Sequence, residues 1–463
     1  WASDRFGSKP VMITGPSLAV LVPILWFLIP RHHPQVLYIA MMIAFFSGMA
    51  MMGWTIGSMR YLYVSAVPRT GLTTYMAVFY AWIGLVGGTG PFLIGPFLDL
   101  TRNIHARYSI LTIDSFTPLF GVVMMFFLSG LVILNRLRAD GAVPVRRFWG
   151  MFMQGNVFLA MESMIRYNRA RDETSRVMQI QRLGDSKNSL TANELIEALD
   201  DPSFNVRFEA IVAISRMPAT PELVDALLLV LAGSEPDLGI AAAWALGKLG
   251  DRSAILPLEE MLLSEYHLLR VHSARALAKL HDVDSIPFFI QQFQNEPDEK
   301  LKLAYASALG TLQVKEMAGD LLELLQKTTD PVLRDELALA LARIVGPEWY
   351  YMQLWRSTRN DFGTTMAQAI LDLSGELYRR RRIDEKIVES MRRSASAFSR
   401  NSVKTGVTVW AECLEEILKS SVFNPTAGKV IEHCVGQLSP FDSDRKVYLL
   451  LTLQVLREEL IRR

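Results

Sequence analysis

The residues with the clearest chemical potential lie in a short segment near the start of the chain, S-D-R-F-G-S-K, residues 3–9. Gly7 permits a tight turn that a side chain would obstruct. Asp4 can cap a helix end or pair with Arg5, and Arg5 and Lys9 can pair with carboxylates or with helix C-termini. The segment therefore predicts either a loop whose charges change partners as helices move, or charges that only fix membrane topology.

The sequence offers little support for metal, redox or nucleotide chemistry. Cys413 and Cys434 are twenty-one residues apart and form no C-x-x-C pair, so we expect two reduced thiols in helices of a cytosolic domain. The seven histidines form no H-E-x-x-H motif, and we expect His267, His272 and His281 at surface or groove positions of a helical repeat. No phosphate-binding G-x-x-x-x-G-K-[ST] segment is present. We therefore predict no metal, no cofactor and no enzyme activity.

Charge is distributed very unevenly along the chain. The 463 residues are 50% hydrophobic with a formal net charge of +1, but residues 1–135 contain only ten charged residues and no Glu. The other 328 residues contain 85 charged residues. The first part suits lipid and the second suits water, which excludes a single soluble globule and a disordered chain. The second part has a net charge of −3, which argues against nucleic acid as a partner.

Four apolar stretches in the first part approach the ~20 residues that a helix needs to cross a bilayer. They cover about residues 11–29, 36–59, 74–98 and 116–134. Continuous apolar runs indicate helices rather than barrel strands. Basic residues near the span ends place the start of the chain, the middle loop and everything after residue 135 in the cytoplasm. The cytoplasmic set is Arg5, Lys9, Arg60, Arg69, Arg136, Arg138, Arg146 and Arg147, and the opposite set is Arg31, Arg102 and Arg107.

Small residues are frequent in these stretches. The pairs Gly53-x-x-x-Gly57 and Gly84-x-x-x-Gly88 let helix backbones approach closely. The third stretch adds two prolines, each of which removes a backbone donor and can bend a helix. These features predict either close packing with a kink or a flexible gating helix. The residues concerned are Gly84, Gly88, Gly90, Pro91, Gly95 and Pro96.

Residues 3–9 resemble the cytoplasmic D-R-x-G-x-[KR] loop of major facilitator superfamily transporters, and residues 67–78 with the following Gly-Pro run are similar to the helix ten to eleven region of that family. The resemblance implies that residues 1–138 form helices nine to twelve of a twelve-helix bundle, in a fragment whose N-terminal part is missing. It also implies that the second stretch lines a solute cavity, with helix packing as the alternative role of its polar and aromatic residues. Those residues are Ser47, Trp54, Thr55 and Ser58.

Residues 139–190 form an amphipathic helical connector in this interpretation. Aromatic residues at 148–153 follow Arg146 and Arg147, which suits a helix at the membrane surface or a helix packed on the cytoplasmic domain. Residues 166–182 suggest a solvated helix. The turn-rich segment 183–190 predicts a domain boundary.

A short marker then recurs at steps of 31 or 32 residues. It reads A-I-S-R-M at 213–217, A-L-G-K-L at 245–249, A-L-A-K-L at 276–280, A-L-G-T-L at 308–312 and A-L-A-R-I at 340–344. Fixed periods of this length indicate a stacked helical solenoid. The pattern resembles HEAT repeats, especially the short HEAT-like repeats first associated with phycobilisome lyases. Five units cover 191–346, and 347–463 predicts degenerate repeats or a helical cap.

The resemblance to HEAT repeats implies a protein-binding scaffold, and no tetrapyrrole-handling site supports a lyase. We therefore expect an all-α protein with four transmembrane helices of a partial major-facilitator bundle, followed by a soluble HEAT-like solenoid. The main hypothesis is transport of a small solute, in a bacterial inner or plasma membrane, with the solenoid in the cytoplasm binding or regulating. Expected partners are membrane lipid, the solute and a protein on the repeats. The alternatives are a membrane-tethered scaffold without transport, or an ADP/ATP-type nucleotide carrier, which would need basic residues in its cavity.

Overall fold

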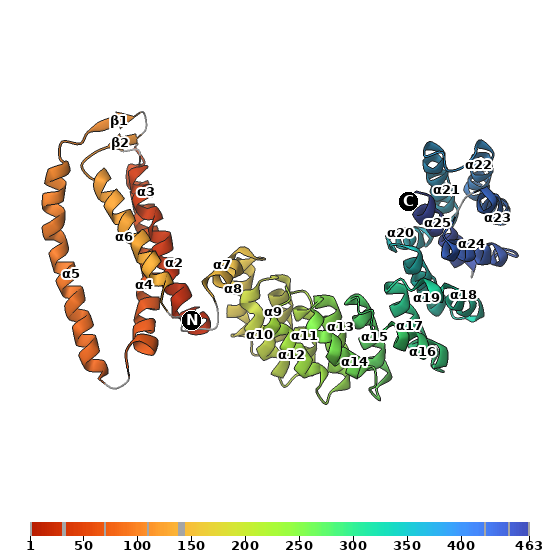
Figure 1. The fold of residues 1–463 in the computed structure, drawn as a ribbon, viewed down its shortest axis with the longest axis horizontal. Helices are drawn as coiled ribbons and strands as arrows, with labels where there is room; N and C mark the ends of the chain where they lie inside the picture. Colours follow the sequence, from red (N-terminus) through yellow and green to blue (C-terminus); the bar gives the residue numbers. More distant parts are fainter. Residues whose placement is uncertain are drawn as a thin grey trace. The chain divides into compact units, whose positions relative to one another are not determined.

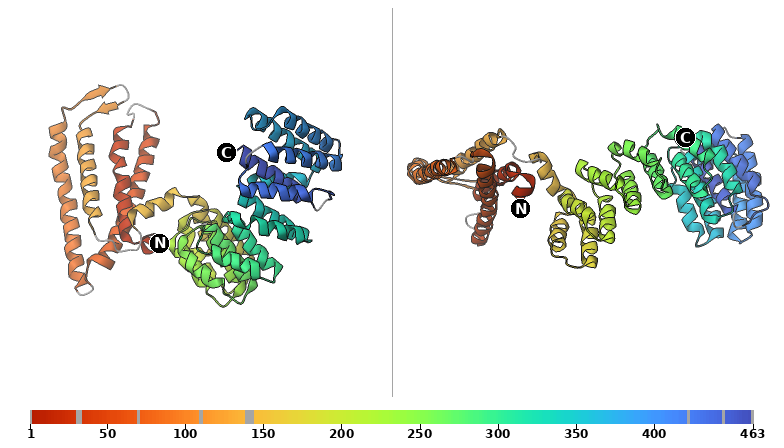
Figure 2. Two further views of the ribbon diagram at one scale, coloured as in Figure 1. Left: turned by 45° about the vertical axis from the view of Figure 1, so that its right-hand side comes forward. Right: turned by 90° about the horizontal axis from the view of Figure 1, so that it is seen from below.

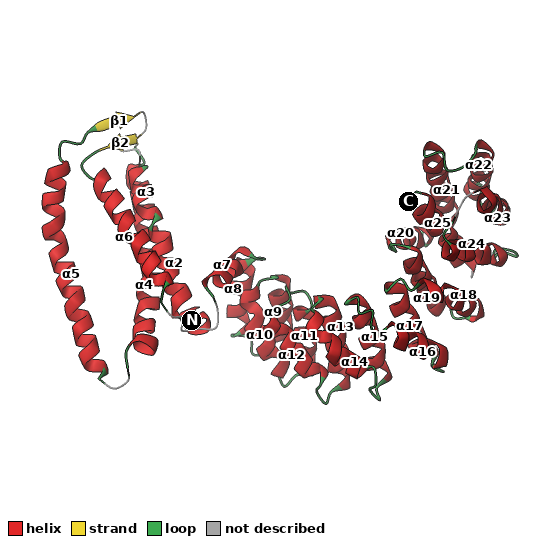
Figure 3. Cartoon of the chain, in the orientation of Figure 1, coloured by secondary structure: helices red, strands yellow, loops and turns green. Residues whose placement is uncertain are grey.

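The structure is a computed structural model that describes residues 2–29, 34–68, 71–108, 111–137, 144–420, 423–442 and 445–461. The chain divides into two compact units, Trp1–Gln154 and Gly155–Arg463. Helices account for nearly all regular structure of the described residues, and strands are confined to one short hairpin (Figure 3). The predicted all-α class is therefore confirmed.

The first unit contains four helices that are long and apolar enough to cross a membrane, at Ser8–Phe27, Val36–Ala66, Leu72–Thr101 and Thr117–Asn135. They match the four predicted stretches to within a few residues, except at the end of the second (Figure 1). Their elements are α2 (Ser8–Ala19) with α3 (Leu21–Phe27), α4 (Val36–Tyr61) with the π-helical turn η1 (Leu62–Ala66), α5 (Leu72–Thr101) and α6 (Thr117–Asn135). Two shorter helices complete the unit, α1 (Ala2–Phe6) and α7 (Val145–Met153).

The connection between α5 and α6 contains a short hairpin. Strands β1 (Ala106–Tyr108) and β2 (Leu111–Ile113) pair antiparallel, with Arg107 opposite Thr112. Three of the basic residues used to predict orientation, Arg31, Arg69 and Arg138, lie outside the described residues.

Helices α2 and α4 approach each other at glycines, as predicted for the pair Gly53-x-x-x-Gly57 on α4. A Cβ atom at Gly57 would lie 2.6 Å from the backbone nitrogen of Met12, and one at Gly15 would lie 2.5 Å from that of Trp54. Gly53 is in ordinary contact with Gly15. The predicted close approach at Gly53 and Gly57 is therefore confirmed.

Helix α5 contains the glycines and prolines of the third apolar stretch. Nothing lies within 4 Å of a Cβ atom built at Gly84, Gly88, Gly90 or Gly95, so these glycines make no close helix contact within the described chain. The helix also continues through Pro91 and Pro96 without interruption (Figure 1). Its exposed side chains include Trp82 and Phe92. No described helix packs closely on these glycines of α5, so their role in packing or gating stays a prediction.

The second unit is a stack of helix pairs (Figure 2). Each A helix packs against the next A helix along the chain, and each B helix packs against the A helix that follows it. The A helices are α9 (Glu173–Asp185), α11 (Phe204–Ile214), α13 (Pro236–Leu249), α15 (His267–Lys279), α17 (Glu299–Thr311) and α19 (Pro331–Val345). The B helices are α10 (Ala192–Glu197), α12 (Pro221–Leu231), α14 (Ile255–Met261), α16 (Ile286–Asn295) and α18 (Ala318–Lys327).

Small residues of the marker allow the A helices to stack closely. A Cβ atom at Gly247 would lie 2.7 Å from the Cα atom of Ala276, and one at Gly310 would lie 2.8 Å from that of Ala340. Each glycine thus faces the first alanine of the next marker. This interlocking explains why the marker repeats at the same period as the helix pairs.

The solenoid begins earlier than the sequence predicts. Ile180 and Leu183 on α9 are fully buried, and a Cβ atom at Gly184 would lie 2.8 Å from Ala213 on α11. Residues 173–185 are therefore an A helix rather than a solvated connector, and the chain has no unit boundary at 183–190. The expected connector 139–190 is divided, since α7 belongs to the first unit and α8 (Val157–Tyr167) to the second.

Residues 347–463 form helices that end in a buried core helix. The helices are α20 (Trp349–Thr358), α21 (Phe362–Arg379), α22 (Glu385–Ser399), α23 (Val403–Ser420), α24 (Pro425–Gln437) and α25 (Lys446–Leu460). Helix α25 packs against α19, α20, α21 and α24, and nearly all its residues are buried. Gln454 on α25 donates a hydrogen bond to the carbonyl of Pro347 at 3.0 Å. This arrangement closes the C-terminal end of the stack.

Candidate functional site

The charged segment near the N-terminus forms a turn between two helices rather than a loop. Gly7 has a φ of +91°, a backbone conformation that favours glycine, and separates α1 from α2. Lys9 donates hydrogen bonds from Nζ to the carbonyl oxygens of Asn135 at 3.0 Å and Leu137 at 2.5 Å. A helix C-terminus is one of the two kinds of partner that the sequence suggests for this lysine.

Arg5 and Asp4 are the other charged residues of this segment. The Arg5 guanidinium lies 5.5 Å from the centre of the Phe6 ring. The side chain of Asp4 lies outside the described part of the structure, although its backbone belongs to α1. Gating by these residues therefore stays a prediction.

The polar residues expected to line a solute cavity are spread along α4. The hydroxyl of Thr55 donates to the carbonyl of Met51 at 2.9 Å, and that of Ser58 donates to the carbonyl of Thr55 at 3.2 Å. Trp54 packs against the apolar cluster around Met12. Ser47 is half-buried on the same helix. Trp54 therefore packs between helices, whereas the hydroxyl contacts of Thr55 and Ser58 stay within α4. A role of these residues in solute binding stays a prediction.

Aromatic residues of the expected membrane-surface helix pack within the first unit. The ring of Phe148 on α7 lies 5.5 Å from the ring of Phe6 and 5.2 Å from that of Phe152. Phe148 is buried, whereas Phe152 and Met153 are exposed. Helix α7 thus contributes to the packing of the unit through one side and leaves apolar side chains exposed on another.

The most regular surface of the molecule is formed by equivalent positions of the A helices. Three positions recur in each repeat. They are the fourth residue of the marker, the residue immediately before the marker, and the residue four positions before the first marker residue. A spacing of i, i+3 and i+7 places them on one helix face. We call this set the A-helix surface. Its members, in repeat order, are Glu209, Val212 and Arg216; Ala241, Trp244 and Lys248; His272, Arg275 and Lys279; Ala304, Ser307 and Thr311; and Glu336, Leu339 and Arg343. All lie on the A helices except Arg216, which follows the end of α11, and Ala241, Ala304 and Ser307 are buried beneath the longer side chains.

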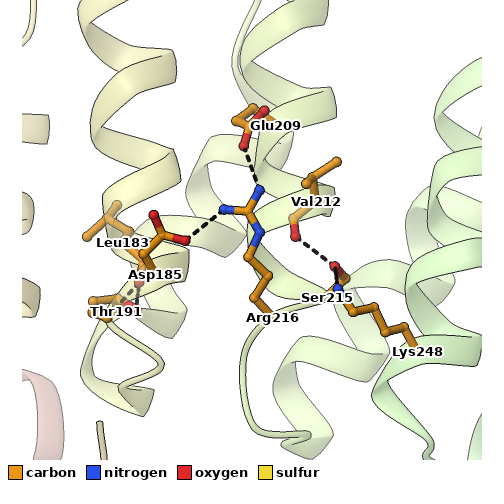
Figure 4. Close-up of polar contacts among 9 residues, drawn as sticks. Leu183, Asp185, Thr191, Glu209, Val212, Ser215, Arg216 and Lys248 are labelled. Atoms are coloured by element: carbon orange, nitrogen blue, oxygen red, sulfur yellow. Dashed lines mark hydrogen bonds and ion pairs between the residues drawn. The ribbon is translucent and has the colours of Figure 1, made fainter. Parts of the chain in front are cut away.

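Ion pairs cover one end of the A-helix surface. The guanidinium of Arg216 lies 2.9 Å from the carboxylate of Asp185 and 3.6 Å from that of Glu209 (Figure 4). In the next repeat, Lys248 contacts the hydroxyl of Ser215 at 3.5 Å. Its ammonium also lies 5.1 Å from the centre of the Trp244 ring, within the range of a cation–π interaction. Arg216 is therefore paired with acidic groups, whereas Lys248 contacts a hydroxyl and a ring.

A pocket of about 690 Å³ opens in the A-helix surface over α17. Helix α17 contributes only small side chains, Ser307 and Thr311, while α15 and α19 on either side contribute long ones. The pocket exists because short side chains lie between long ones. It is lined by Trp244, His272, Arg275, Ala276, Lys279, Ser307, Thr311, Gln313, Glu336, Leu339, Arg343, Gly346, Pro347 and Glu348.

Most charges of the pocket are paired. Arg275 forms an ion pair with Glu336, and Arg343 forms one with Glu348. Arg343 also donates to the hydroxyl of Ser307 at 3.1 Å. Lys279 is exposed and has no ion-pair partner among the described residues. The unbalanced charge of the pocket is therefore positive.

The pKa of His272 reports on this environment. Burial and the cations Arg275 and Lys279 lower its pKa below the ordinary value of 6.5. We expect a neutral imidazole at pH 7, and a higher pKa in Lys279→Met, in an NMR titration of the imidazole carbons. Because the pKa is lower in the folded than in the unfolded state, this histidine weakens folding as the pH falls below 6.5. A folded-state pKa at or above 6.5 would contradict this assignment.

Both cysteines are buried and free, as the sequence predicts. Burial raises the pKa of Cys413 to about 12 and that of Cys434 further. Since the thiolate is the reactive form, we expect neither thiol to react with an aromatic disulfide reagent in the native protein. Both should react after unfolding in guanidinium chloride. Rapid reaction of either thiol under native conditions would contradict the burial described here.

The marker predicts the repeats, and it also creates a surface that its period alone does not reveal. The fourth marker residue is Arg, Lys or Thr in all five copies, which is a signal for an exposed polar column. His272 lines the pocket, in agreement with its expected groove position. No group of three or more potential metal ligands lies close together in the described parts of the chain.

Comparisons with known proteins bear on the second unit. Residues 192–278 and 224–310 match the HEAT repeats family. The chain matches no curated protein, and no comparison identifies a major facilitator domain. Among solved structures, the complex of CpcE and CpcF of phycocyanin lyase from Nostoc sp. is similar, with a TM-score of 0.35 and 20% identity over 51% of this chain and 94% of that chain. The predicted HEAT-like repeats are therefore confirmed for residues 192–310.

Proposed function

We propose that this protein is a membrane-anchored scaffold whose HEAT-like unit binds a protein partner on the A-helix surface. The observation that carries the proposal is a column of polar side chains at the fourth marker position of five successive repeats, none of them buried, beside a pocket over α17. Stacked repeats use such extended surfaces for binding other proteins. The proposal includes no enzyme activity.

The anchor in this proposal is the set of four apolar helices of the first unit. The most apolar segments of these helices have mean hydropathies between 1.6 and 2.3. In three of the four helices, at most 11% of the residues of that segment are buried. Exposed apolar surface of this extent is costly in water and favourable in lipid. The basic residues at the span ends favour a cytoplasmic location for the scaffold, in a bacterial inner or plasma membrane.

Photocrosslinking at defined positions tests the scaffold function. A photoreactive residue at Ser307 lies in the pocket, whereas one at Leu263 lies in the exposed turn after a B helix. In cells that make the full chain, we expect a discrete adduct in the membrane fraction from position 307 and none from position 263. The same adduct from both positions, or none from position 307, would contradict binding at the A-helix surface.

Solute transport is the second candidate function. The observation that favours it is the contact of Lys9 with the end of α6, which is a contact expected of a gating residue. The four apolar helices carry no charged residue in their interior in the sequence, so a nucleotide carrier lacks the cations it would need here. We rank transport below the scaffold, because the repeat surface has both regularity and a pocket.

A further inference from the structure

We propose that the A-helix surface binds an acidic segment of the partner protein, in which two carboxylate side chains are three residues apart. This inference rests on the proposed scaffold function and specifies the chemistry of the partner. The carboxylates pair with Lys248 and Lys279, and an apolar side chain of the same segment enters the pocket over α17.

Charge complementarity supports an acidic partner. Lys248 and Lys279 occupy the same marker position on adjacent helices, and both are exposed. Neither has a carboxylate partner among the described residues, whereas Arg216, Arg275 and Arg343 are all paired with acidic groups. The two lysines form a cationic pair without a counterion on an otherwise neutralised surface.

The spacing of the lysines sets the spacing of the carboxylates. Helices α13 and α15 pack directly, so equivalent positions on them are separated by roughly one interhelical distance, about 8–10 Å. A polyproline II segment rises about 3.1 Å per residue with three residues per turn. Residues three apart therefore lie about 9 Å apart on the same side of the segment. A Glu-x-x-Glu pattern matches the two lysines, whereas adjacent glutamates do not.

The pocket favours an apolar side chain next to the carboxylate that pairs with Lys279, because Lys279 lines the pocket and Lys248 does not. The hydroxyl of Thr311 already donates to the carbonyl of Ser307 at 2.9 Å, and the hydroxyl of Ser307 accepts from Arg343. Trp244 and Leu339 supply apolar walls that are partly buried. The hydroxyl hydrogen of Thr311 is therefore taken, and the ammonium group of Lys279 is the exposed cation at the edge of the pocket.

Binding of labelled peptides to the full chain in nanodiscs of zwitterionic lipid tests the proposal. The probe is a fluorescein-labelled twelve-residue peptide that contains Glu-Pro-Pro-Glu-Leu, and the comparison peptide has the same composition with adjacent glutamates. We expect the spaced peptide to bind more tightly, and binding to weaken with added salt. Lys248→Glu and Lys279→Glu should each weaken binding about tenfold, through a lost ion pair and a new repulsion. Lys386→Glu, an exposed charge reversal on α22, should leave it unchanged.

Three outcomes of the peptide binding measurements would overturn the acidic-segment proposal, and a fourth comes from competition with phosphate. These are equal binding of the two peptides, full binding by both lysine variants, or an equal loss in Lys386→Glu. Displacement of the peptide by millimolar inorganic phosphate with full loss of the spacing preference would also overturn it, since it would show a simple anion site. Failure here is distinguishable from failure of the scaffold function, because position-specific crosslinking from residue 307 does not depend on the partner's charge.

Discussion

Replacing Trp410 with alanine is expected to lower the free energy of unfolding of the second unit by about 3–5 kcal/mol, the range for truncating a large buried aromatic residue. Trp410 on α23 is fully buried, and its indole nitrogen donates a hydrogen bond to Thr452 on α25 at 3.0 Å. The truncation therefore removes a large side chain and a contact between two helices. Urea unfolding followed by circular dichroism measures the change.

Two further variants separate the contributions of packing and hydrogen bonding. Trp410→Phe keeps most of the ring and loses the hydrogen bond, so we expect a smaller loss of about 1–2 kcal/mol. Tyr378→Ala removes a half-exposed ring on α21 and should change stability by less than either. Equal effects of Trp410→Ala and Tyr378→Ala would contradict the described core.

Replacing Gly247 with alanine is expected to destabilise the stack by about 1–3 kcal/mol, as overpacking of close contacts does. The added Cβ atom would lie 2.7 Å from both the Cα and Cβ atoms of Ala276, so α13 and α15 would have to move apart. A loss of stability would be informative, because replacing glycine with alanine inside a helix normally raises the stability. Thermal unfolding of the two proteins gives the comparison.

Gly375 provides the matched control for this prediction. It lies within α21, and nothing is within 4 Å of a Cβ atom built there. Gly375→Ala should therefore stabilise the unit by about 0.5–1 kcal/mol. A stabilising Gly247→Ala would show that the A helices stack less closely than described.

The sequence predicted the elements whose signals are local or periodic. Four apolar stretches gave the four long helices, because chain length and hydropathy alone determine which segments suit a bilayer. The five-residue marker, which recurs every 31 or 32 residues, predicted the repeats, because it supplies the small residues that the next A helix contacts. Gly7 was correctly predicted to make a turn, because its φ of +91° suits glycine.

The sequence failed where partners are distant in the chain. Residues 173–185 have a polar composition that suggests a solvated helix, yet Ile180 and Leu183 are buried against α11. Helix α25 contains both charged and apolar residues, and its central position follows from four packing partners that no local pattern reveals. The pocket depends on small residues of α17 lying between long residues of its neighbours, which requires the stacking order to be known.

The central claim is that one chain combines an apolar unit for lipid with a scaffold unit for water. Alkaline carbonate and high-salt extraction of membranes from cells that make the full chain tests this claim directly, with a chain of residues 155–463 as the matched comparison. We predict that the full chain stays in the membrane pellet and enters detergent, while residues 155–463 are soluble and strongly helical. Release of the full chain by carbonate would contradict the claim.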